Sequence, residues 1–209
     1  GNIIVSGMIK NNSIPIVKKK CNLKKLLFIS QYKNYPRHGT WSGTFGEKST
    51  FEILLKAETD LIPLLANYCA KNGVQLEICG NTKSKDEVSF FHSLIGQQNN
   101  NWHFYPRIDV QKTYEMLDQA SAVANIDSTL GYEALARKKP TAAFSIWGAY
   151  NGTFAHFGDF YSRVWNFGLP KKFSDTGPFW TNHLNEAILN EILNLVLNIN
   201  QEDWEKIYD

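Results

Sequence analysis

Apolar and polar positions along the chain predict strands and helices in turn. Short apolar runs, typical of buried strands, cover residues 25–30, 74–79, 102–105, 121–126 and 140–144. Segments with apolar positions at helical spacing cover residues 49–72, 85–95, 110–119, 129–137 and 184–198, and a last helical turn is expected at 202–208. Pro63 predicts a kink or a split in the first of these helices.

This repeated alternation favours a doubly wound parallel sheet with helices on both faces, a Rossmann-like α/β fold. Ligands of such sheets bind at the carboxyl ends of the strands, where loops lead into helix N-termini. The candidate site loops therefore follow Ser30, Cys79, Tyr105, Ile126 and Phe144. The length of 209 residues fits one such domain over residues 1–209.

Composition narrows the class of protein. Hydrophobic residues make up 43% of the chain, charged residues make up 20%, and the net charge is only +2. A nucleic-acid binder is usually more strongly basic, so no nucleic-acid partner is expected. The three cysteines, Cys21, Cys69 and Cys79, form no CxxC motif. They suggest neither a disulfide framework nor a zinc site, and they fit a reducing cytosol.

The motif with the most chemistry lies in residues 125–140, which read as strand, tight turn, helix and strand. Ser128 and Thr129 stand where the helix begins, and backbone N–H groups and hydroxyls at such a point bind anions. Gly131 allows the close approach of a ligand or of the neighbouring strand. Glu133, about one turn further on, could accept hydrogen bonds from a ribose diol.

A structural interpretation of the same residues needs no ligand. Asp127 or Ser128 would cap the helix, and Glu133 would pair with Arg137 at the i,i+4 spacing. Glu133 does not fit a capping box, because it does not stand three residues after Asp127, Ser128 or Thr129. The pattern alone leaves both interpretations open.

The turn and its glutamate resemble the donor-binding motif of GT-B-fold glycosyltransferases, which implies that this domain is one half of a GT-B fold. Ser128 and Thr129 would then hold the donor phosphate, and Glu133 would hold the ribose. Together with the later segment SDTGPFWTN at residues 174–182, the motif is similar to bacterial surface-carbohydrate biosynthesis proteins of lipopolysaccharide or capsule. The resemblance covers roughly residues 26–182.

Two further loops carry candidate side chains. Lys33 and Arg37 follow the first strand and could neutralise phosphate, or they could simply be part of a solvated basic loop. Tyr105 could stack on the base of the nucleotide and Arg107 could reach its phosphate, although aromatic residues at strand ends more often pack against other side chains. The aromatic segment at residues 146–168 is either a lid over a sugar or a loop that packs against a further domain.

Missing motifs exclude other enzymes. The sequence has no GxGxxG after a strand, no P-loop, no GxSxG and no HExxH. It also lacks a DxD pair, which would have suggested a metal-dependent transferase. We therefore expect no metal and no cofactor, because a helix dipole and basic side chains can stabilise the leaving phosphate.

These observations predict the donor-binding domain of a glycosyltransferase, whose partners are a nucleotide sugar and a carbohydrate or lipid-linked acceptor of a surface polysaccharide. Such an enzyme normally has about twice this length, and the start at Gly1 suggests a cut in a linker. We expect a missing N-terminal acceptor domain that supplies the catalytic base, which stays unassigned, and no activity from the isolated chain. The expected location is the cytoplasm, with the inner face of the membrane as an option. The alternatives are a nucleotide-sugar 2-epimerase and a non-catalytic nucleotide-sugar-binding module.

Overall fold

Six parallel strands form the central sheet, in the order β5-β4-β1-β6-β7-β8. The strands are β1 (Lys25–Ile29), β4 (Gln75–Cys79), β5 (Trp102–Tyr105), β6 (Ala122–Asn125), β7 (Thr141–Phe144) and β8 (Trp180–Thr181), and a small antiparallel pair consists of β2 (Trp41–Ser42) and β3 (Lys48–Ser49). This computed structural model describes residues 11, 13–17, 23–33, 41–42, 48–96, 99–107, 109–146, 167–168 and 173–208. The five strands predicted from apolar runs are confirmed to within one residue at each end.

Helices connect the strands and cover the sheet. They are α2 (Phe51–Leu54), α3 (Lys56–Lys71), α4 (Lys85–Ile95), α5 (Val110–Gln119), α6 (Thr129–Ala136), α9 (Glu186–Asn198) and α10 (Gln201–Tyr208). No helix within the described residues is long and apolar enough to cross a membrane. The sequence thus predicted the helical segments correctly, apart from one interruption.

Of the two outcomes predicted at Pro63, a kink or a split, the split is wrong, because α3 continues through that residue and the break falls at Leu55 instead. A proline removes one backbone hydrogen bond from a helix and clashes with the preceding turn. Here the buried side chains of Leu61 and Leu65, on either side of Pro63, pack into the core and hold the helix together.

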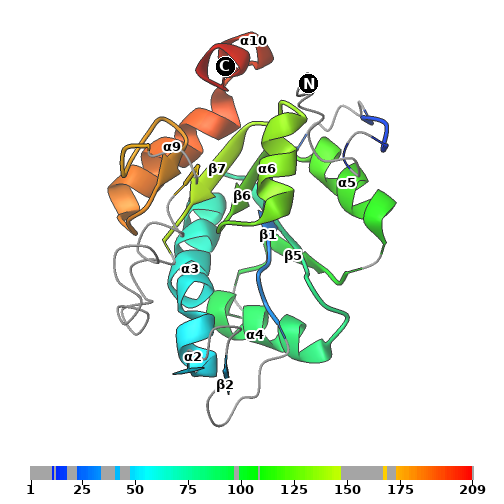
Figure 1. Cartoon of the computed structure of the whole chain (residues 1–209), viewed down its shortest axis with the longest axis vertical. Coiled ribbons are helices and arrows are strands. Elements are labelled where there is room, and N and C mark those ends of the chain that lie inside the picture. Colours follow the sequence, from blue (N-terminus) through cyan, green and yellow to red (C-terminus); the bar gives the residue numbers. More distant parts are fainter. Residues whose placement is uncertain are drawn as a thin grey trace, which may run out of the picture.

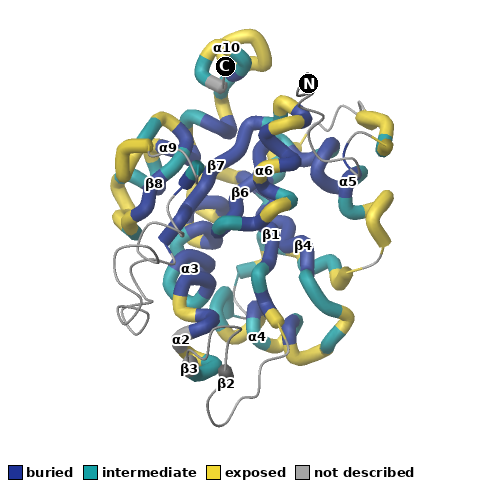
Figure 2. The backbone as a smooth tube through the Cα atoms, in the orientation of Figure 1, coloured by how far each residue is buried: buried dark blue, intermediate teal, exposed yellow. Residues whose placement is uncertain are grey.

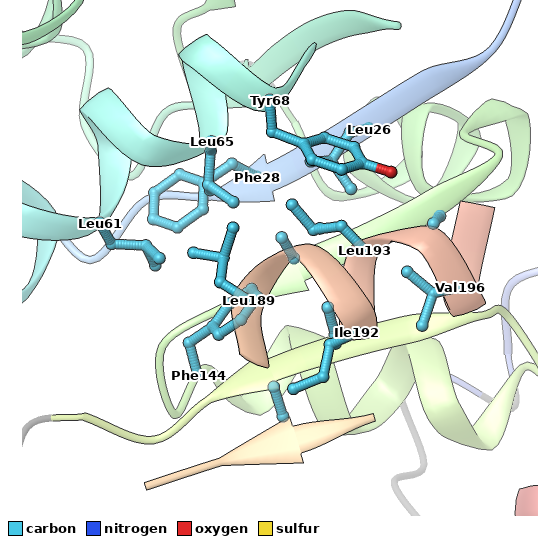
Figure 3. Packing of buried hydrophobic residues seen from close by; sticks show 14 of the residues in the cluster. Leu26, Phe28, Leu61, Leu65, Tyr68, Phe144, Leu189, Ile192, Leu193 and Val196 are labelled. Atoms are coloured by element: carbon cyan, nitrogen blue, oxygen red, sulfur yellow. The ribbon is translucent and has the colours of Figure 1, made fainter. Parts of the chain in front are cut away.

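Two apolar clusters fill the two faces of the sheet. The larger one packs α3, α4 and α9 against the sheet, and its members include Phe28, Leu65 and Leu193 (Figure 3). The smaller one packs α5 and α6 against the other sides of the same strands, with Leu27, Val123 and Leu117 at its centre. Each fully buried side chain of this kind contributes about 1.5–3 kcal/mol to folding. The inner strands β1, β4, β6 and β7 are therefore buried on both faces, whereas the edge strand β5 is only partly covered. Exposed residues lie mostly on the outer sides of the helices and in the loops (Figure 2).

The order of the strands creates one switch point. From β1 the chain winds outward through β4 to β5, and it then crosses back to β6 and winds the other way to β7 and β8 (Figure 1). The register pairs Ile29 of β1 with Cys79 on one side and with Asn125 on the other. The loops after β1, β4 and β6 consequently start at the same edge of the sheet, where such folds bind ligands.

A buried ion pair fixes the segment that precedes β1. Arg137 contacts Asp118 of α5 through two hydrogen bonds, Nη2 to Oδ2 at 2.6 Å and Nε to Oδ1 at 2.9 Å. The same guanidinium donates to the backbone carbonyls of Ile14 (3.1 Å) and Pro15 (3.3 Å). The expected pairing of Glu133 with Arg137 is therefore wrong, since the guanidinium faces α5 and the N-terminal segment.

Candidate functional site

A cavity of about 470 Å³ lies at the switch point, outside the carboxyl ends of β1, β4 and β6. Its walls come from four places in the chain that the sheet register brings together. The lining residues are Ile29, Ser30 and Gln31 after β1; Cys79, Gly80 and Asn81 after β4; Arg107, Asp109, Val110, Thr113 and Tyr114 at the start of α5; and Asp127, Ser128, Thr129, Leu130 and Glu133 at the start of α6. The cavity therefore combines two helix starts with several charged and polar side chains.

The start of α6 offers backbone and side-chain donors to the cavity. Ser128 is the N-cap residue, but its side chain makes no capping hydrogen bond. Its backbone N–H donates to Oδ1 of Asn125 at 3.3 Å, which holds the turn against the end of β6. The amides of Thr129 and Leu130 open the helix, where N–H groups have no partner within the helix itself. These amides and the Ser128 hydroxyl form an environment that favours an anion.

Glu133 lies one turn further along α6, and its side chain is nearly enclosed, with only 6% of the residue exposed. Tyr114 of α5 donates its hydroxyl to Oε2 of Glu133. The other carboxylate oxygen, Oε1, accepts no hydrogen bond from the described residues. A nearly buried carboxylate that faces a cavity with a free oxygen is suited to a ligand that donates hydrogen bonds.

Asp127 is the second residue after β6, within the turn that leads to α6, and it has the left-handed backbone conformation with φ of +50°. Aspartate tolerates this conformation better than most residues do. Its Oδ1 accepts a hydrogen bond from Ser145, which follows β7, at 2.5 Å. Burial raises the pKa of Asp127 to about 7. This carboxyl group therefore changes its charge close to neutral pH.

Two buried glutamates hold the loop after β1. Oε1 of Glu58, from α3, accepts the backbone N–H of Gln31 at 3.0 Å, and Glu87, from α4, accepts the hydroxyl of Ser30 at 2.7 Å. Burial is the largest of the effects that raise the pKa of Glu58 to about 8, and the nearby charge of Glu87 adds to it. At neutral pH Glu58 is thus mostly uncharged, which removes repulsion between the two carboxyl groups.

Glu87 also fixes the loop after β4. It accepts the backbone N–H groups of Asn81 (2.8 Å) and Thr82 (2.7 Å) as well as the Thr82 hydroxyl. The backbone N–H of Arg107 donates in turn to the carbonyl of Thr82 at 3.0 Å. This bonded loop places the exposed Arg107 on the cavity wall, where it is a cation among the acidic groups of Asp127 and Glu133.

The structure brings together part of the predicted site. Ser128, Thr129, Glu133 and Arg107 all line the cavity. Gly131 does not line it, because it lies beneath the side chain of Asn125. A Cβ at that position would come within 2.3 Å of Cγ of Asn125, so the glycine serves the close approach of the neighbouring strand and not of a ligand.

The remaining candidates lie elsewhere. Tyr105 does not line the cavity, and its hydroxyl contacts Glu77 at 3.5 Å while its ring packs beside the smaller apolar cluster. Lys33 is exposed and is also not part of the cavity wall. Arg37 lies outside the described residues, as does most of the aromatic segment, at 147–166.

Among the cavity residues that sequence reasoning did not propose, Tyr114, Gln31 and Asp127 carry polar side chains at its wall. Tyr114 follows Asp109, the N-cap residue of α5, whose Oδ1 accepts the Lys112 N–H at 2.7 Å. A helix that begins at Asp109 must bring its first turns toward the switch point, and that was the available signal for Tyr114. Gln31 and Asp127 begin two of the predicted site loops, but no local pattern showed that they line the cavity, because the placement of their side chains depends on long-range contacts.

The described residues of the cavity wall include no cluster of metal ligands. Within the part of the chain that the structure describes, no group of three or more histidine, cysteine, aspartate or glutamate side chains could hold a metal ion. Among the described residues, the charged and polar groups of the cavity wall include the helix starts, Arg107 and the carboxyl groups.

A parallel sheet with this strand order, and with a polar cavity at the switch point, defines a Rossmann-like α/β domain. Consistent with this, the fold is similar to a mutant of the O-GlcNAc transferase of Thermobaculum terrenum, with a TM-score of 0.52 and 9% sequence identity over 94% of this chain. The chain spans 32% of that protein. The UDP-GlcNAc 2-epimerase of Neisseria meningitidis, bound to UDP-GlcNAc, gives a TM-score of 0.47 and 10% identity over 96% of this chain and 42% of that one.

The sequence defines the family more closely. All of residues 1–209 match the family described as "putative O-antigen biosynthesis protein", and the chain belongs to this family. No curated protein sequence matches it. The chain is thus a GT-B-like domain with a role in the biosynthesis of a surface carbohydrate.

Proposed function

We propose that this chain is the donor-binding domain of a glycosyltransferase and that it binds a nucleotide-activated sugar in the cavity at the switch point. The observation that carries the proposal is Glu133, a nearly buried carboxylate with a free oxygen, placed one turn behind the open start of α6. A nucleotide with a phosphate and a ribose diol matches both features.

The charges on the cavity wall support one orientation of the proposed ligand. Phosphate oxygens accept hydrogen bonds, so they suit the amides of Thr129 and Leu130, the Ser128 hydroxyl and the Arg107 guanidinium. Glu133 would repel a phosphate but accepts hydrogen bonds from neutral hydroxyl groups. The phosphate therefore lies at the start of α6, and the ribose lies deeper, toward α5.

The wider function follows from this donor site together with the family. The nucleotide sugar would supply a residue for an O-antigen or a related carbohydrate or lipid-linked acceptor, in the cytoplasm. An acceptor domain that precedes this one would provide the catalytic base, and neither a metal nor a cofactor is needed. Radiolabelled sugar transfer by a longer chain that includes such a domain tests this, whereas the present chain alone should bind nucleotide without transferring sugar.

The experiment that tests the site is calorimetric titration of this chain with UDP, GDP, CMP and dTDP, repeated with Glu133→Gln. A hydrogen bond to a charged group contributes about 1.5–3 kcal/mol, so the variant should bind the preferred nucleotide about 10- to 150-fold more weakly. Glutamine still offers Tyr114 an acceptor, so the melting temperature should change little.

The matched control is Glu115→Gln on the exposed side of α5. It changes the net charge by the same amount outside the cavity and should leave the affinity unchanged. If none of the four nucleotides binds to the wild-type chain, the proposal is wrong. If Glu133→Gln binds as well as the wild type does, the glutamate has only a structural role. Release of nucleotide with a changed sugar and no acceptor would favour an epimerase.

A further inference from the structure

Tyr114 and Glu133 form a hydrogen-bonded pair that lines the cavity. The tyrosine comes from the second turn of α5 and the glutamate from the second turn of α6, and β6 lies between these helices in the sequence. Both side chains are nearly enclosed, with 2% of Tyr114 and 6% of Glu133 exposed. Since both residues also line the cavity, we assign the small exposed surface of each to the site.

The direction of the hydrogen bond decides what this pair offers to a ligand. Burial first, and then the bond to Glu133, raise the pKa of Tyr114, so the phenol keeps its proton. That single proton is donated to Oε2 of Glu133. The phenol oxygen can then only accept a further hydrogen bond, and Oε1 of the carboxylate can only accept as well.

Two acceptors side by side select a ligand with two neighbouring donors. A phosphate has acceptors only, and a single hydroxyl would use one of the two positions. A vicinal diol presents two adjacent O–H donors and uses both. Resting on the proposed function, we propose that Tyr114 is a second ribose-binding residue, whose phenol oxygen accepts one hydroxyl of the nucleotide diol while Oε1 of Glu133 accepts the other.

The surroundings hold Tyr114 in place for this task. The guanidinium of Arg137 lies over its ring, 5.1 Å from the centroid, and two hydrogen bonds to Asp118 fix that guanidinium. The phenol oxygen is therefore placed before a ligand arrives, and little conformational entropy is lost when the ligand binds.

The test compares ribonucleotides with their deoxy forms. The dissociation constants of UDP, GDP and CMP and of their 2′-deoxy and 3′-deoxy counterparts are measured for the wild-type chain and for Tyr114→Phe. The wild type should bind both deoxy forms more weakly than the ribonucleotide, because each lacks one of the two donors. Tyr114→Phe should bind the ribonucleotide about 2- to 10-fold more weakly, the range of a neutral hydrogen bond, and should lose discrimination against one deoxy form only.

Tyr105→Phe is the matched control, since Tyr105 also contacts a glutamate, Glu77, but outside the cavity. It should change none of these affinities. Equal weakening of ribo and deoxy forms by Tyr114→Phe would mean a structural role and would overturn the proposal, as would unchanged affinities. The wild-type comparison tests the pair without any variant, because equal binding of the ribo and both deoxy forms also overturns it. If no nucleotide binds at all, the donor-site assignment itself is wrong.

Discussion

Replacing Arg137 with alanine should destabilise the protein far more than its place near a helix end suggests. The side chains of Arg137 and Asp118 are only 3% and 2% exposed, and their closest nitrogen and oxygen are 2.6 Å apart. The substitution would leave the Asp118 carboxylate buried. Among the described residues, its remaining hydrogen-bond partner would be the Val17 N–H at 2.8 Å. Breaking a buried pair by removing one partner costs about 3–5 kcal/mol.

This cost corresponds to a decrease in melting temperature of about 6–20 °C for a chain of this size. Urea unfolding followed by tryptophan fluorescence measures the free energy of unfolding directly, and the buried Trp204 makes it a good reporter of the core. Asp118→Ala should destabilise by a similar amount. The double variant should be clearly more stable than the sum of the two losses predicts, because it leaves no unpaired buried charge.

The control is Lys138→Ala, next in the sequence. Its ion pair with Glu205, at 2.9 Å, has side chains that are 56% and 37% exposed, so its loss should cost only about 0–1 kcal/mol. If Arg137→Ala also loses less than about 1 kcal/mol, the pair behaves like a surface contact. The conclusion that the buried Arg137–Asp118 pair fixes the N-terminal segment would then be refuted.

Two further predictions concern stability. The pKa of Glu58 is raised from 4.5 to about 8 in the folded state, so the folded state binds more protons and the free energy of unfolding should fall as pH rises from about 5 to 8. Glu58→Gln should flatten this dependence of the free energy of unfolding on pH. If the wild type and the variant show the same dependence on pH, the assignment is wrong. Gly131→Ala should lower the melting temperature, because overpacking against Asn125 costs about 1–3 kcal/mol and outweighs a helix-propensity gain of about 1 kcal/mol. An unchanged or higher melting temperature would show that Asn125 can move aside.

The strand positions could be predicted because they depend on local patterns. Parallel strands buried on both faces are continuous apolar runs, and the runs in residues 25–30 and 121–126 became β1 and β6. β8 could not be found in this way, since it has two residues, Trp180 and Thr181, and owes its place to pairing with β7. The interruption at Leu55 and the continuity through Pro63 were likewise decided by packing and not by local preference.

The candidate site was predictable where a local motif met a rule of the fold. Ser128, Thr129 and Glu133 lie in one turn and helix, and the rule that ligands bind at strand ends placed them correctly at the cavity. The partner of Glu133 could not be predicted, because i,i+4 spacing suggested Arg137, whereas the fold supplies Tyr114 from another helix. Contacts between distant segments depend on how helices are oriented on the sheet, and single-sequence patterns do not contain that information.

The central position of β1 also has a consequence for how the protein acquires its site. Lys25 pairs with Gln75, 50 residues later, and Leu26 pairs with Ala122, 96 residues later. Such distant pairings make folding slow, because long loops must close before the strands are stabilised. During synthesis, the cavity cannot form until β6 has emerged and paired with β1. A truncated or prematurely released chain that ends before β6 would therefore lack the cavity altogether, and the exposed edge of β1 would be open to pairing with other chains.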